Sequence, residues 1–483
     1  MAEPPPDQEK IRPQFWLQMA HPYGLEDISA YKRQLREVYT LHALALFQLF
    51  EERPISNCCG KYSISVILAV MNEHQQTAVG IDIGTTNIRC VIGLVKEDLT
   101  VNVVGVGEAP NNGFRKGSVV NITETANALD QAIANAERMA GLQVGSATVN
   151  INGTHIKGVD SKGIIAISGS EVTQEDLYRA EDASTVLQIP QHHEILSVFP
   201  RSYTVDGQDN IKDPVGMSGT RLEVDAHVVT VSAPALKNLE KVLEVTDTHI
   251  NRISVGSLGS AHATVTAEQK ENGVAVLDIG ATTTNLIVIE DGDVQHVAVV
   301  PIGGNQITND LAIGLRTDLN IAEAVKRNYK YLATPGKTRP KHVKVLVSGK
   351  EHVFPTKDIE LVITARLAEL FELVDKELAK IRRSKKLPGG INITGGTASL
   401  PGIDVIAKEE LALSTRVTLP RGIAGLKEKV SKPEYATSVG LMLLDVHKDE
   451  DGSYGGRGIG GRLQHGADQA RSLFKQIAGR LGF

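Results

Sequence analysis

Cysteine is scarce in this chain, and the few cysteines form no paired motif. The 483 residues include three cysteines, of which Cys58 and Cys59 are adjacent. Three cysteines in this arrangement make neither a disulfide framework nor a C-x-x-C zinc site. We therefore expect a reducing, cytoplasmic compartment.

Long apolar runs and an excess of positive charge are missing as well. The longest apolar run, about Val66 to Met71, is far shorter than the roughly 18 to 20 residues needed to cross a bilayer. The N-terminus lacks the positive start and apolar stretch of a secretory signal. The net charge is −6 and the pI is about 6.2, unlike the basic footprint of a nucleic-acid-binding protein. We expect no transmembrane segment and no nucleic-acid partner.

Aromatic residues are only 4% of the chain, so the core must rest on aliphatic side chains. From Thr77 onward, short β-branched runs alternate with helical patterns, which predicts an α/β fold with helices packed over a sheet. The first elements expected are strands over 77–83, 88–95, 101–109 and 147–151, with a helix over 122–139.

A smaller unit, about residues 155–225, interrupts this pattern. Thr173 and Asp176 have the spacing of a capping box, which predicts the start of a helix. The surrounding elements are expected to be short strands over 195–199 and 221–224, before the main pattern resumes with a strand over 227–231 and a helix over 233–245.

An internal repeat is the most informative feature of the sequence. Residues 80–87 read GIDIGTTN, and residues 276–283 read VLDIGATT. Each copy is an apolar strand that ends in Asp-Ile-Gly and is followed by small hydroxylated residues and a second apolar strand. Two copies nearly 200 residues apart predict two structurally similar halves.

The repeated turns are typical of phosphate binding. Glycine at a tight bend lets backbone N–H groups approach a phosphate, and Asp82 and Asp278 can hold a Mg²⁺ directly or through its waters. One such turn alone is common as a purely structural feature, whereas a matched pair favours a nucleotide site. In a third motif, residues 391–402, Gly395 and Gly396 leave room for a flat ring. The hydroxyl donors expected at the turns are those of Thr85, Thr86, Thr282 and Thr283.

These motifs resemble those of the actin, Hsp70 and sugar-kinase superfamily, and within it the chain is similar to the FtsA family of bacterial cell-division proteins over about 78–483. The further segments that carry this resemblance are 105–107 with 116–117, 171–176, 212–219, 303–305 with Thr308 and Asp310, 322–326 and 435–440.

The resemblance implies an α/β, actin-like fold: two related ribonuclease H-like halves around a nucleotide cleft, an inserted subdomain and a C-terminal amphipathic helix. The implied parts are a poorly ordered extension (1–76), subdomain 1A (77–155 and 226–262), the SHS2-like insert 1C (156–225), subdomain 2A (263–304 and 386–446), subdomain 2B (305–385), a flexible linker (447–466) and a membrane-targeting helix (467–483).

The resemblance also implies ATP and Mg²⁺ as cofactors, with Asp82 and Asp278 at the metal. The implied nucleotide-binding residues are Asp82, Gly84, Thr85, Thr86, Asn87, Gly280, Ala281, Thr282, Thr283, Glu323, Lys326, Gly395, Gly396 and Thr397. Two positions depart from the family: Ala281 lies where the second turn often has glycine, and Asn87 lies where lysine is frequent. Both put fast hydrolysis in doubt, so we expect at most a slow ATPase with no catalytic residue named.

The last segment, 467–483, has one apolar stripe with cations beside it and follows a Gly-rich linker. A cationic amphipathic helix on a tether suits the interface of an anionic membrane, although a helix docked on its own body has the same pattern. The candidate membrane-binding residues are Arg471, Leu473, Phe474, Lys475, Ile477, Arg480 and Leu481.

The function implied by the resemblance is a scaffold that polymerises at the cytoplasmic face of the cell membrane at the division site and tethers FtsZ. Its partners would be the FtsZ C-terminal peptide on 305–385, with Lys357 and Arg366 as candidate cations, other copies of the chain, anionic lipids, and later division proteins through the insert. The alternatives are a pilus-assembly adaptor and a small-molecule kinase. The kinase would need a catalytic carboxylate, and the sequence offers no convincing candidate for one.

Overall fold

The computed structural model describes residues 76–186, 189–330 and 340–446. The predicted N-terminal extension, apart from its last residue, lies outside the described residues, as do the linker and the membrane-targeting helix.

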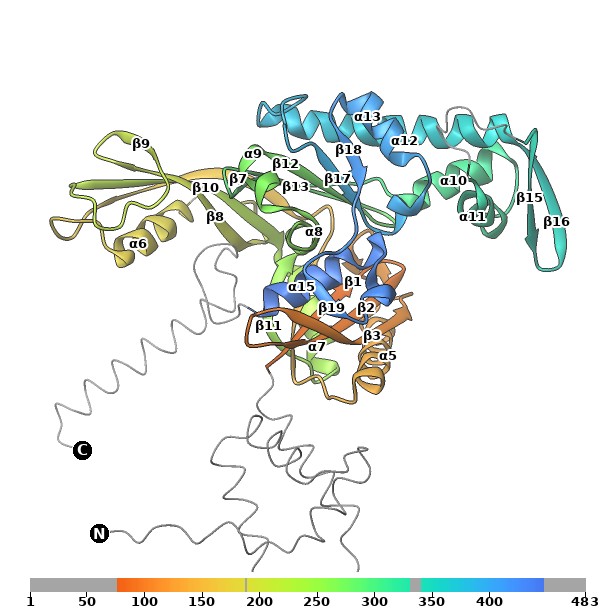
Figure 1. Cartoon of the computed structure of the whole chain (residues 1–483), viewed down its shortest axis with the longest axis horizontal. Coiled ribbons are helices and arrows are strands. Elements are labelled where there is room, and N and C mark those ends of the chain that lie inside the picture. The colour runs from red at the N-terminus through yellow and green to blue at the C-terminus, as the bar shows by residue number, and fades with distance from the viewer. Residues whose placement is uncertain (1–75, 187–188, 331–339, 447–483) are drawn as a thin grey trace, which may run out of the picture. The chain divides into compact units, whose positions relative to one another are not determined.

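Two sheets that share the same order of five strands form the body of the protein, and the first sheet has a sixth strand at one edge (Figure 1). In each, a three-stranded antiparallel meander is followed by two strands that join it in parallel. The first sheet has the order β11 (His249–Val255), β6 (Ser146–Ile151), β1 (Thr77–Ile83), β2 (Asn87–Val95), β3 (Val101–Pro110), β19 (Ile423–Gly425). The second has the order β18 (Thr415–Val417), β17 (Ile391–Thr394), β12 (Val274–Ile279), β13 (Thr284–Glu290), β14 (Asp293–Val300). The shared order confirms the two related halves.

The first half is closed by α5 (Ile122–Ala140), which lies directly on β3. Asn121 caps the helix by accepting a hydrogen bond from the Glu124 N–H, and a stripe of small apolar residues faces the sheet. A Cβ on Gly107 would lie 1.9 Å from the Ala132 carbonyl oxygen. The glycine in this strand is therefore needed for the close approach of helix and sheet.

Two helices, α8 (Gly256–Thr264) and α15 (Ala436–Val446), cross between the halves. They meet at Gly259 and Gly440, where a Cβ on Gly440 would lie 1.7 Å from the Gly259 carbonyl oxygen. α15 lies equally close to β1, since a Cβ on Gly80 would lie 2.1 Å from the Ser438 carbonyl oxygen. Small residues thus bring both helices close to the ends of the central strands.

The inserted unit is a four-stranded sheet in the order β7 (Lys157–Ala166), β10 (Arg221–Ser232), β8 (His193–Val205), β9 (Gln208–Ile211), with α6 (Gln174–Ser184) packed on it. The capping box of Thr173 and Asp176 at the start of α6 is confirmed. The two separate strands predicted over 221–224 and 227–231 are wrong, because both belong to β10. The break placed between them coincides with a β-bulge at Asp225 and Ala226, where the strand continues past an irregular register. β10 also pairs with β7 and β8 throughout, so its second part belongs to the insert's sheet.

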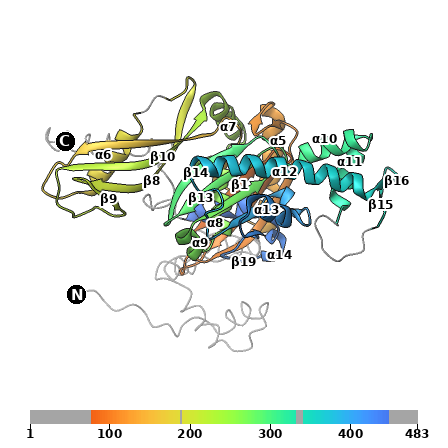
Figure 2. The ribbon, with the colours of Figure 1, turned by 90° about the horizontal axis from the view of Figure 1, so that it is seen from above.

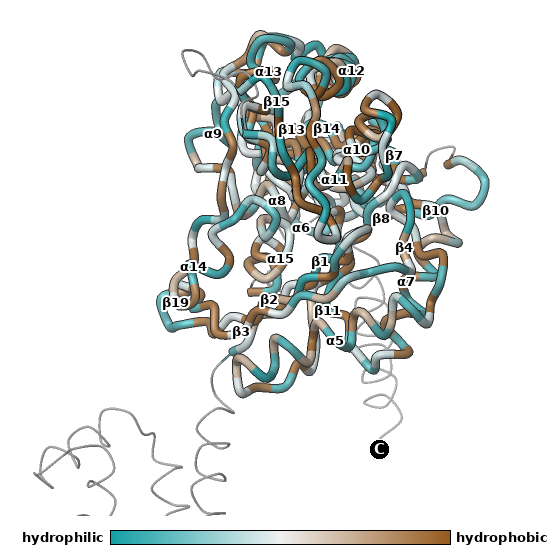
Figure 3. The backbone as a smooth tube through the Cα atoms, turned by 90° about the vertical axis from the view of Figure 1, so that its right-hand side faces the viewer, coloured by the Kyte–Doolittle hydropathy of each residue, from teal (hydrophilic) through white to brown (hydrophobic). Residues whose placement is uncertain are grey.

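The second half carries most of the remaining helices. Figure 2 shows α10 and α11 with the β15–β16 hairpin on the side away from the insert, while α12 runs back from this hairpin to β14. Brown, hydrophobic colour runs along β13 and β14 in Figure 3, and their side chains are largely buried. None of the helices in the described ranges combines the length and apolar character needed to span a bilayer. The remaining elements are β4 (Phe114–Arg115), β5 (Ser118–Val119), α7 (Ala233–Val245), α9 (Ala267–Asn272), α10 (Gly304–Gly314), α11 (Leu319–Asn328), β15 (His342–Val347), β16 (Lys350–Pro355), α12 (Thr356–Lys380), η3 (Gly396–Ser399), α13 (Ile403–Leu411), α14 (Lys427–Val430) and η4 (Pro433–Tyr435).

Candidate functional site

The two Asp-Ile-Gly turns have the same backbone structure. β1 and β2 pair up to Ile83 and Ile88, and the Gly84 N–H donates to the Asn87 carbonyl oxygen at 3.1 Å. In the second hairpin, which ends β12 and begins β13, the Gly280 N–H donates to the Thr283 carbonyl oxygen at 2.9 Å. Each turn therefore holds four residues in a matching bend. The sequence repeat is a structural repeat.

The tips of the two turns meet. The hydroxyl oxygens of Thr85 and Thr282 lie 3.1 Å apart and share a hydrogen bond, although the residues are 197 positions apart in the chain. Both side chains are only half-buried. The structure thus brings together one predicted hydroxyl donor from each turn. Of the other two, Thr86 is exposed and Thr283 is buried.

Asp82 lies buried beneath the first turn. Asn150, at the end of β6, donates from Nδ2 to Asp82 Oδ1 at 2.5 Å and accepts the Ile83 N–H at 2.7 Å. Burial, together with the charge of Asp278, raises the pKa of Asp82 to about 7, against the opposing effects of Arg89 and Asn150. A carboxylate in this position lacks sufficient compensating charge at neutral pH.

Asp278 lies in the matching position beneath the second turn. Burial raises the pKa of this carboxyl, and hydrogen bonds to its ionised form oppose the shift. Thr437 of α15 donates to Asp278 Oδ2 at 3.0 Å, and Ser260 of α8 does so at 3.3 Å. The two crossing helices thus hold one of the two carboxylates at the bottom of the site.

Arg89 is the charged residue at the site that the sequence interpretation missed. It lies opposite Asp82 in the β1–β2 register, and its positive charge lowers the pKa of both Asp82 and Asp278. Its guanidinium pairs with Glu108 at 3.0 Å and lies 5.3 Å from the centroid of the Tyr435 ring. The signal was present in the sequence, because the residue opposite the aspartate of a four-residue hairpin lies seven positions after it.

The third motif closes the site from the second half. Gly395 has φ +88°, and a Cβ there would lie 2.3 Å from Asp278 Oδ1. A Cβ on Gly396, in contrast, would meet nothing within 4 Å. The Thr397 hydroxyl donates to the Gly280 carbonyl oxygen at 2.9 Å. The glycine pair therefore runs tightly past the carboxylate and presents open space on its other side.

Glu323 and Lys326, from α11, lie beside the start of α10. Lys326 Nζ donates to the Gly304 carbonyl oxygen at 3.0 Å and pairs with Glu323 at 2.7 Å. Thr308 donates to the same carboxylate at 2.6 Å. The first amide of α10, that of Gly304, donates in turn to the Gly280 carbonyl oxygen at 3.0 Å. These predicted residues therefore lie together behind the second turn.

One predicted residue turns away from the others. Asn87 Nδ2 donates to Glu108 Oε1 at 2.6 Å, so its side chain is directed to the same acidic residue that holds Arg89. Its predicted contact with phosphate stays a prediction.

The donor set fits a hard cation and a polyphosphate. Two buried carboxylates with raised pKa values lie near enough for the charge of Asp278 to raise the pKa of Asp82, and Mg²⁺ takes one or two carboxylates with its remaining ligands from water and phosphate. The side-chain oxygens of Asn152 and Asn285 are buried without a hydrogen-bond partner among the described residues. Asn285 lies opposite Asp278 in its hairpin, as Arg89 lies opposite Asp82. The Asn285 side chain also hydrogen-bonds to Asp278, so its oxygen suits the waters of a cation bound beside that carboxylate.

The family described as "SHS2 domain inserted in FTSA" matches residues 153–230, and the family "Cell division protein FtsA" matches residues 275–440. Cell division protein FtsA of Pseudomonas aeruginosa is 37% identical over 383 residues, which cover 77% of this chain and 90% of the relative. That of Bacillus subtilis is 35% identical over 374 residues, covering 77% of this chain and 83% of the relative.

Among solved structures, the PilM-PilN type IV pilus biogenesis complex matches with a TM-score of 0.57. The match covers 76% of this chain and 98% of the other chain at 17% sequence identity. Identity this low supports the actin-like fold alone.

Proposed function

The chain belongs to the FtsA family of cell-division proteins, and from this premise we propose that it is an ATP-binding, actin-like scaffold. The proposal has three parts: a nucleotide site between the paired turns, attachment to the membrane, and docking of a division partner. The observation that carries the first part is the meeting of the two turns at Thr85 and Thr282 above two buried carboxylates.

In the proposed complex, backbone N–H groups and hydroxyls of both turns bind the phosphates. Mg²⁺ supplies the positive charge that neutralises phosphates and carboxylates, with Asp82 and Asp278 on the protein side. Gly396 offers an open backbone surface for the adenine. Lys326 bonds to Gly304, which lies directly behind the second turn, and from there it would approach the nucleoside. Turnover is expected to be slow, because no residue is assigned as a general base.

The test is a titration with a fluorescent ATP analogue in the presence and absence of Mg²⁺. Tight binding should require Mg²⁺ and should weaken at least tenfold in Asp278→Asn, which keeps the size of the side chain but removes its charge. Thr173→Ala, a change at the α6 cap in the insert, is a control that should leave the affinity unchanged. Equal binding by Asp278→Asn and the parent chain would exclude this site.

The second part of the proposal is attachment to the cytoplasmic face of the membrane through 467–483. This segment lies outside the described residues, so the support is its sequence pattern and the membership of the family. One short helix contributes only a few kcal/mol through its apolar side chains, whereas linked copies on a polymer bind much more firmly. Polymerisation and membrane binding should therefore reinforce one another.

Co-sedimentation with anionic liposomes tests this part. The full chain should sediment with the vesicles in the presence of ATP, and a truncation ending at Gly466 should stay in solution. Phe474→Glu keeps the chain length and places a charge on the apolar stripe, so it should behave like the truncation. If all three proteins sediment equally, the membrane attachment is refuted.

The third part is docking of the FtsZ C-terminal peptide on 305–385. Arg366, one of the two candidate cations, is already paired with Asp310 at 2.5 Å and with Glu369 at 2.6 Å, whereas Lys357 is exposed at the start of α12. The nearby exposed side chains of Leu361 and Ile313 offer apolar contacts. Anisotropy of a labelled peptide should show weaker binding to Lys357→Glu than to the parent chain, and equal binding would place the docking surface elsewhere.

A further inference from the structure

The outer edge of β14 is bonded to side chains of the insert. β14 is the last strand in its sheet, where it pairs with β13. The carbonyl oxygen of Gln295 and the N–H of Val297, two residues apart, are both directed to the insert rather than to β13. An unpaired strand edge offers such groups to any neighbour.

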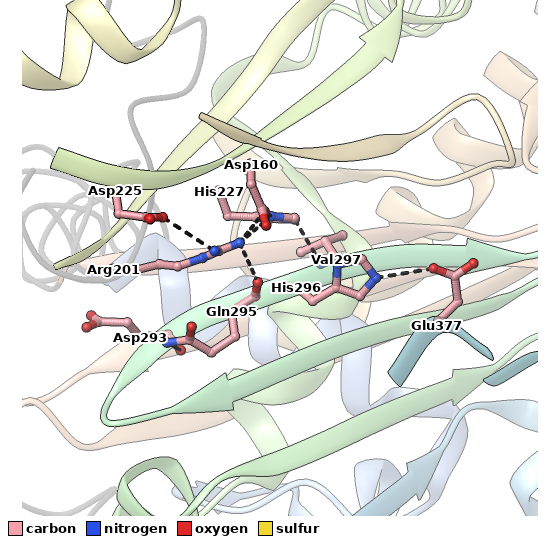
Figure 4. Close-up of polar contacts among 9 residues, drawn as sticks. All are labelled: Asp160, Arg201, Asp225, His227, Asp293, Gln295, His296, Val297 and Glu377. Atoms are coloured by element: carbon pink, nitrogen blue, oxygen red, sulfur yellow. Dashed lines mark hydrogen bonds and ion pairs between the residues drawn. The ribbon is translucent and has the colours of Figure 1, made fainter. Parts of the chain in front are cut away.

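Two side chains of the insert satisfy this edge (Figure 4). Arg201 of β8 donates from Nη2 to the Gln295 carbonyl oxygen at 2.8 Å, and His227 of β10 accepts the Val297 N–H on Nε2 at 3.0 Å. One side-chain donor and one side-chain acceptor thus replace the backbone groups of a neighbouring strand. We call Arg201, His227 and Asp160 the clasp.

The hydrogen bond from Val297 fixes the state of the imidazole. Because Nε2 accepts a backbone N–H, the proton of neutral His227 lies on Nδ1, which donates to Asp160 Oδ1 at 2.8 Å. Arg201 donates to the same carboxylate and reaches Asp225 at 3.4 Å. Arg201 Nη2 and His227 Nδ1 lie 3.0 Å apart because both donate to Asp160 Oδ1, and they form no hydrogen bond with each other.

Apolar packing extends the clasp into the core of the protein. Phe199, Val229 and Val231 of the insert belong to the same buried cluster as Val294 and Val297 of β14. The side chain of His227 is 1% exposed, and that of Asp160 is 58% exposed. The clasp thus extends from the apolar contact between the insert and β14, where His227 is buried, to the protein surface, where Asp160 is exposed.

The insert is connected by the chain to the first half and packs on the second half. It leaves β6 next to Asn150, which holds Asp82, and it returns through Ser232 into α7. On the other side, β14 pairs with β13, which begins at Thr284 directly after the second turn. The clasp therefore links the insert, which follows β6 beside β1 of the first turn, to β14, which pairs with β13 of the second turn.

We propose that Arg201 and His227 are positioning residues for the nucleotide site: they fasten the insert to the edge of β14 and so restrain the separation of the two turns. This inference rests on the proposed binding of ATP. Release of the clasp lets the halves separate more often, and a bound nucleotide then leaves faster.

The test uses the full chain with Arg201→Met, which keeps the length of the side chain and removes its donors. Asp160 stays largely exposed in this variant, so water replaces its lost partner. The matched control is Lys212→Met, because Lys212 also pairs with Asp293 of β14 but its side chain is 51% exposed. Arg201→Lys, which keeps the charge, is the conservative variant.

Two measurements are made on each variant: hydrogen exchange of the amides in 293–300 without nucleotide, and the release rate of a fluorescent ATP analogue. Arg201→Met should raise both rates about tenfold, as for the loss of one charge-assisted hydrogen bond. Lys212→Met should leave both within twofold, and Arg201→Lys should recover part of the loss.

If the hydrogen-exchange rates of the amides in 293–300 are the same in Arg201→Met as in the parent chain, Arg201 does not fasten the insert to β14, and the proposal is wrong. Faster exchange with an unchanged release rate shows a clasp that does not restrain the site, which also overturns the proposal. If the parent chain binds no analogue at all, the proposed function fails first, and it takes this inference with it.

Discussion

Replacing Asp82 by asparagine should stabilise the nucleotide-free protein at alkaline pH while it impairs the binding of Mg²⁺. The pKa of this carboxyl is raised from 3.8 to about 7 by burial and by the charge of Asp278. At 1.36 kcal/mol for each tenfold change, the ionised form is about 4 kcal/mol less favourable in the folded protein than in water. Asparagine has nearly the same shape without the charge, and its oxygen still accepts the hydrogen bond from Asn150.

The sign of the pH dependence follows from proton uptake. Between pH 3.8 and about 7, the folded protein holds a proton on Asp82 that the unfolded chain has lost. Stability therefore falls as the pH rises through this window. Asp82→Asn removes this part of the pH dependence, so the gain in unfolding free energy should be about 1–2 kcal/mol at pH 5 and should reach at most about 4 kcal/mol at pH 8.

Urea denaturation of both proteins from pH 5 to pH 8, without Mg²⁺ or nucleotide, measures this gain. Asp445→Asn is the matched control, since Asp445 is equally buried but accepts from the Val79 N–H, Thr148 and Asn251. An asparagine at position 445 would place its NH₂ group, a donor, against these three donors. Asp445→Asn should therefore destabilise the protein at every pH. A loss of stability in Asp82→Asn at pH 8 would refute the reasoning, because it would mean that Arg89 already compensates the ionised carboxylate.

Mg²⁺ must bind the ionised form of Asp82, so its affinity in the presence of ATP should be constant above pH 7 and should fall by up to tenfold per pH unit below it. Isothermal titration in several buffers measures this dependence. Gly395→Ala should cost about 1–3 kcal/mol of stability and weaken nucleotide binding, since φ is +88° and the new Cβ would lie 2.3 Å from Asp278 Oδ1; unchanged binding would contradict this contact. Gly440→Ala should cost more than about 3 kcal/mol in urea, because its Cβ would lie 1.7 Å from the Gly259 carbonyl oxygen, and a loss below 1 kcal/mol would contradict the close helix crossing. Burial lowers the pKa of His227, so stability should fall as the pH drops below 6.5, where the unfolded imidazole takes up a proton first; a pH titration of His227→Gln should lack this loss. The groups that face His227 in that titration are Asp160, Arg201, Asp225 and His296, and His296 contacts Glu377 in turn.

The elements nearest the site were predictable because local pattern and tertiary role agree there. β1 is observed over the predicted residues, and so is α7. The Asp-Ile-Gly repeat predicted both turns, since the glycine and the small residues after it are required by the bend itself. β10 was not predictable in the same way. The bulge at Asp225 looks like the end of a strand in sequence, whereas hydrogen bonds to β7 and β8 carry the strand through it.

The side chains that complete the site come from positions that local pattern does not mark. Ser260 and Thr437 reach Asp278 only because α8 and α15 cross at two glycines, and the two residues are 177 positions apart. In the sequence, His227 looks like an ordinary residue of a β-strand. Its role follows only from its hydrogen bond to Val297 of β14, 70 positions away in the chain. In each case the partner is distant in the chain, and a single sequence holds no record of the contact.

The two halves repeat the same backbone at the paired turns and differ in the charge that each places beside its buried aspartate. The residue opposite the buried aspartate is Arg89 in the first hairpin and Asn285 in the second. If both positions held arginine, the carboxylates would be neutralised without a metal ion, and Mg²⁺ would be repelled from the site. If both held a neutral amide, two buried carboxylates would face one another uncompensated, at a cost of several kcal/mol. One arginine near two aspartates compensates their charge only in part, which leaves a role for a divalent cation that also carries phosphates. Arg89→Ala should therefore raise the pKa of Asp82 further and move the pH midpoint of Mg²⁺ binding upward, and a midpoint that stays in place would show that Arg89 acts on Glu108 alone.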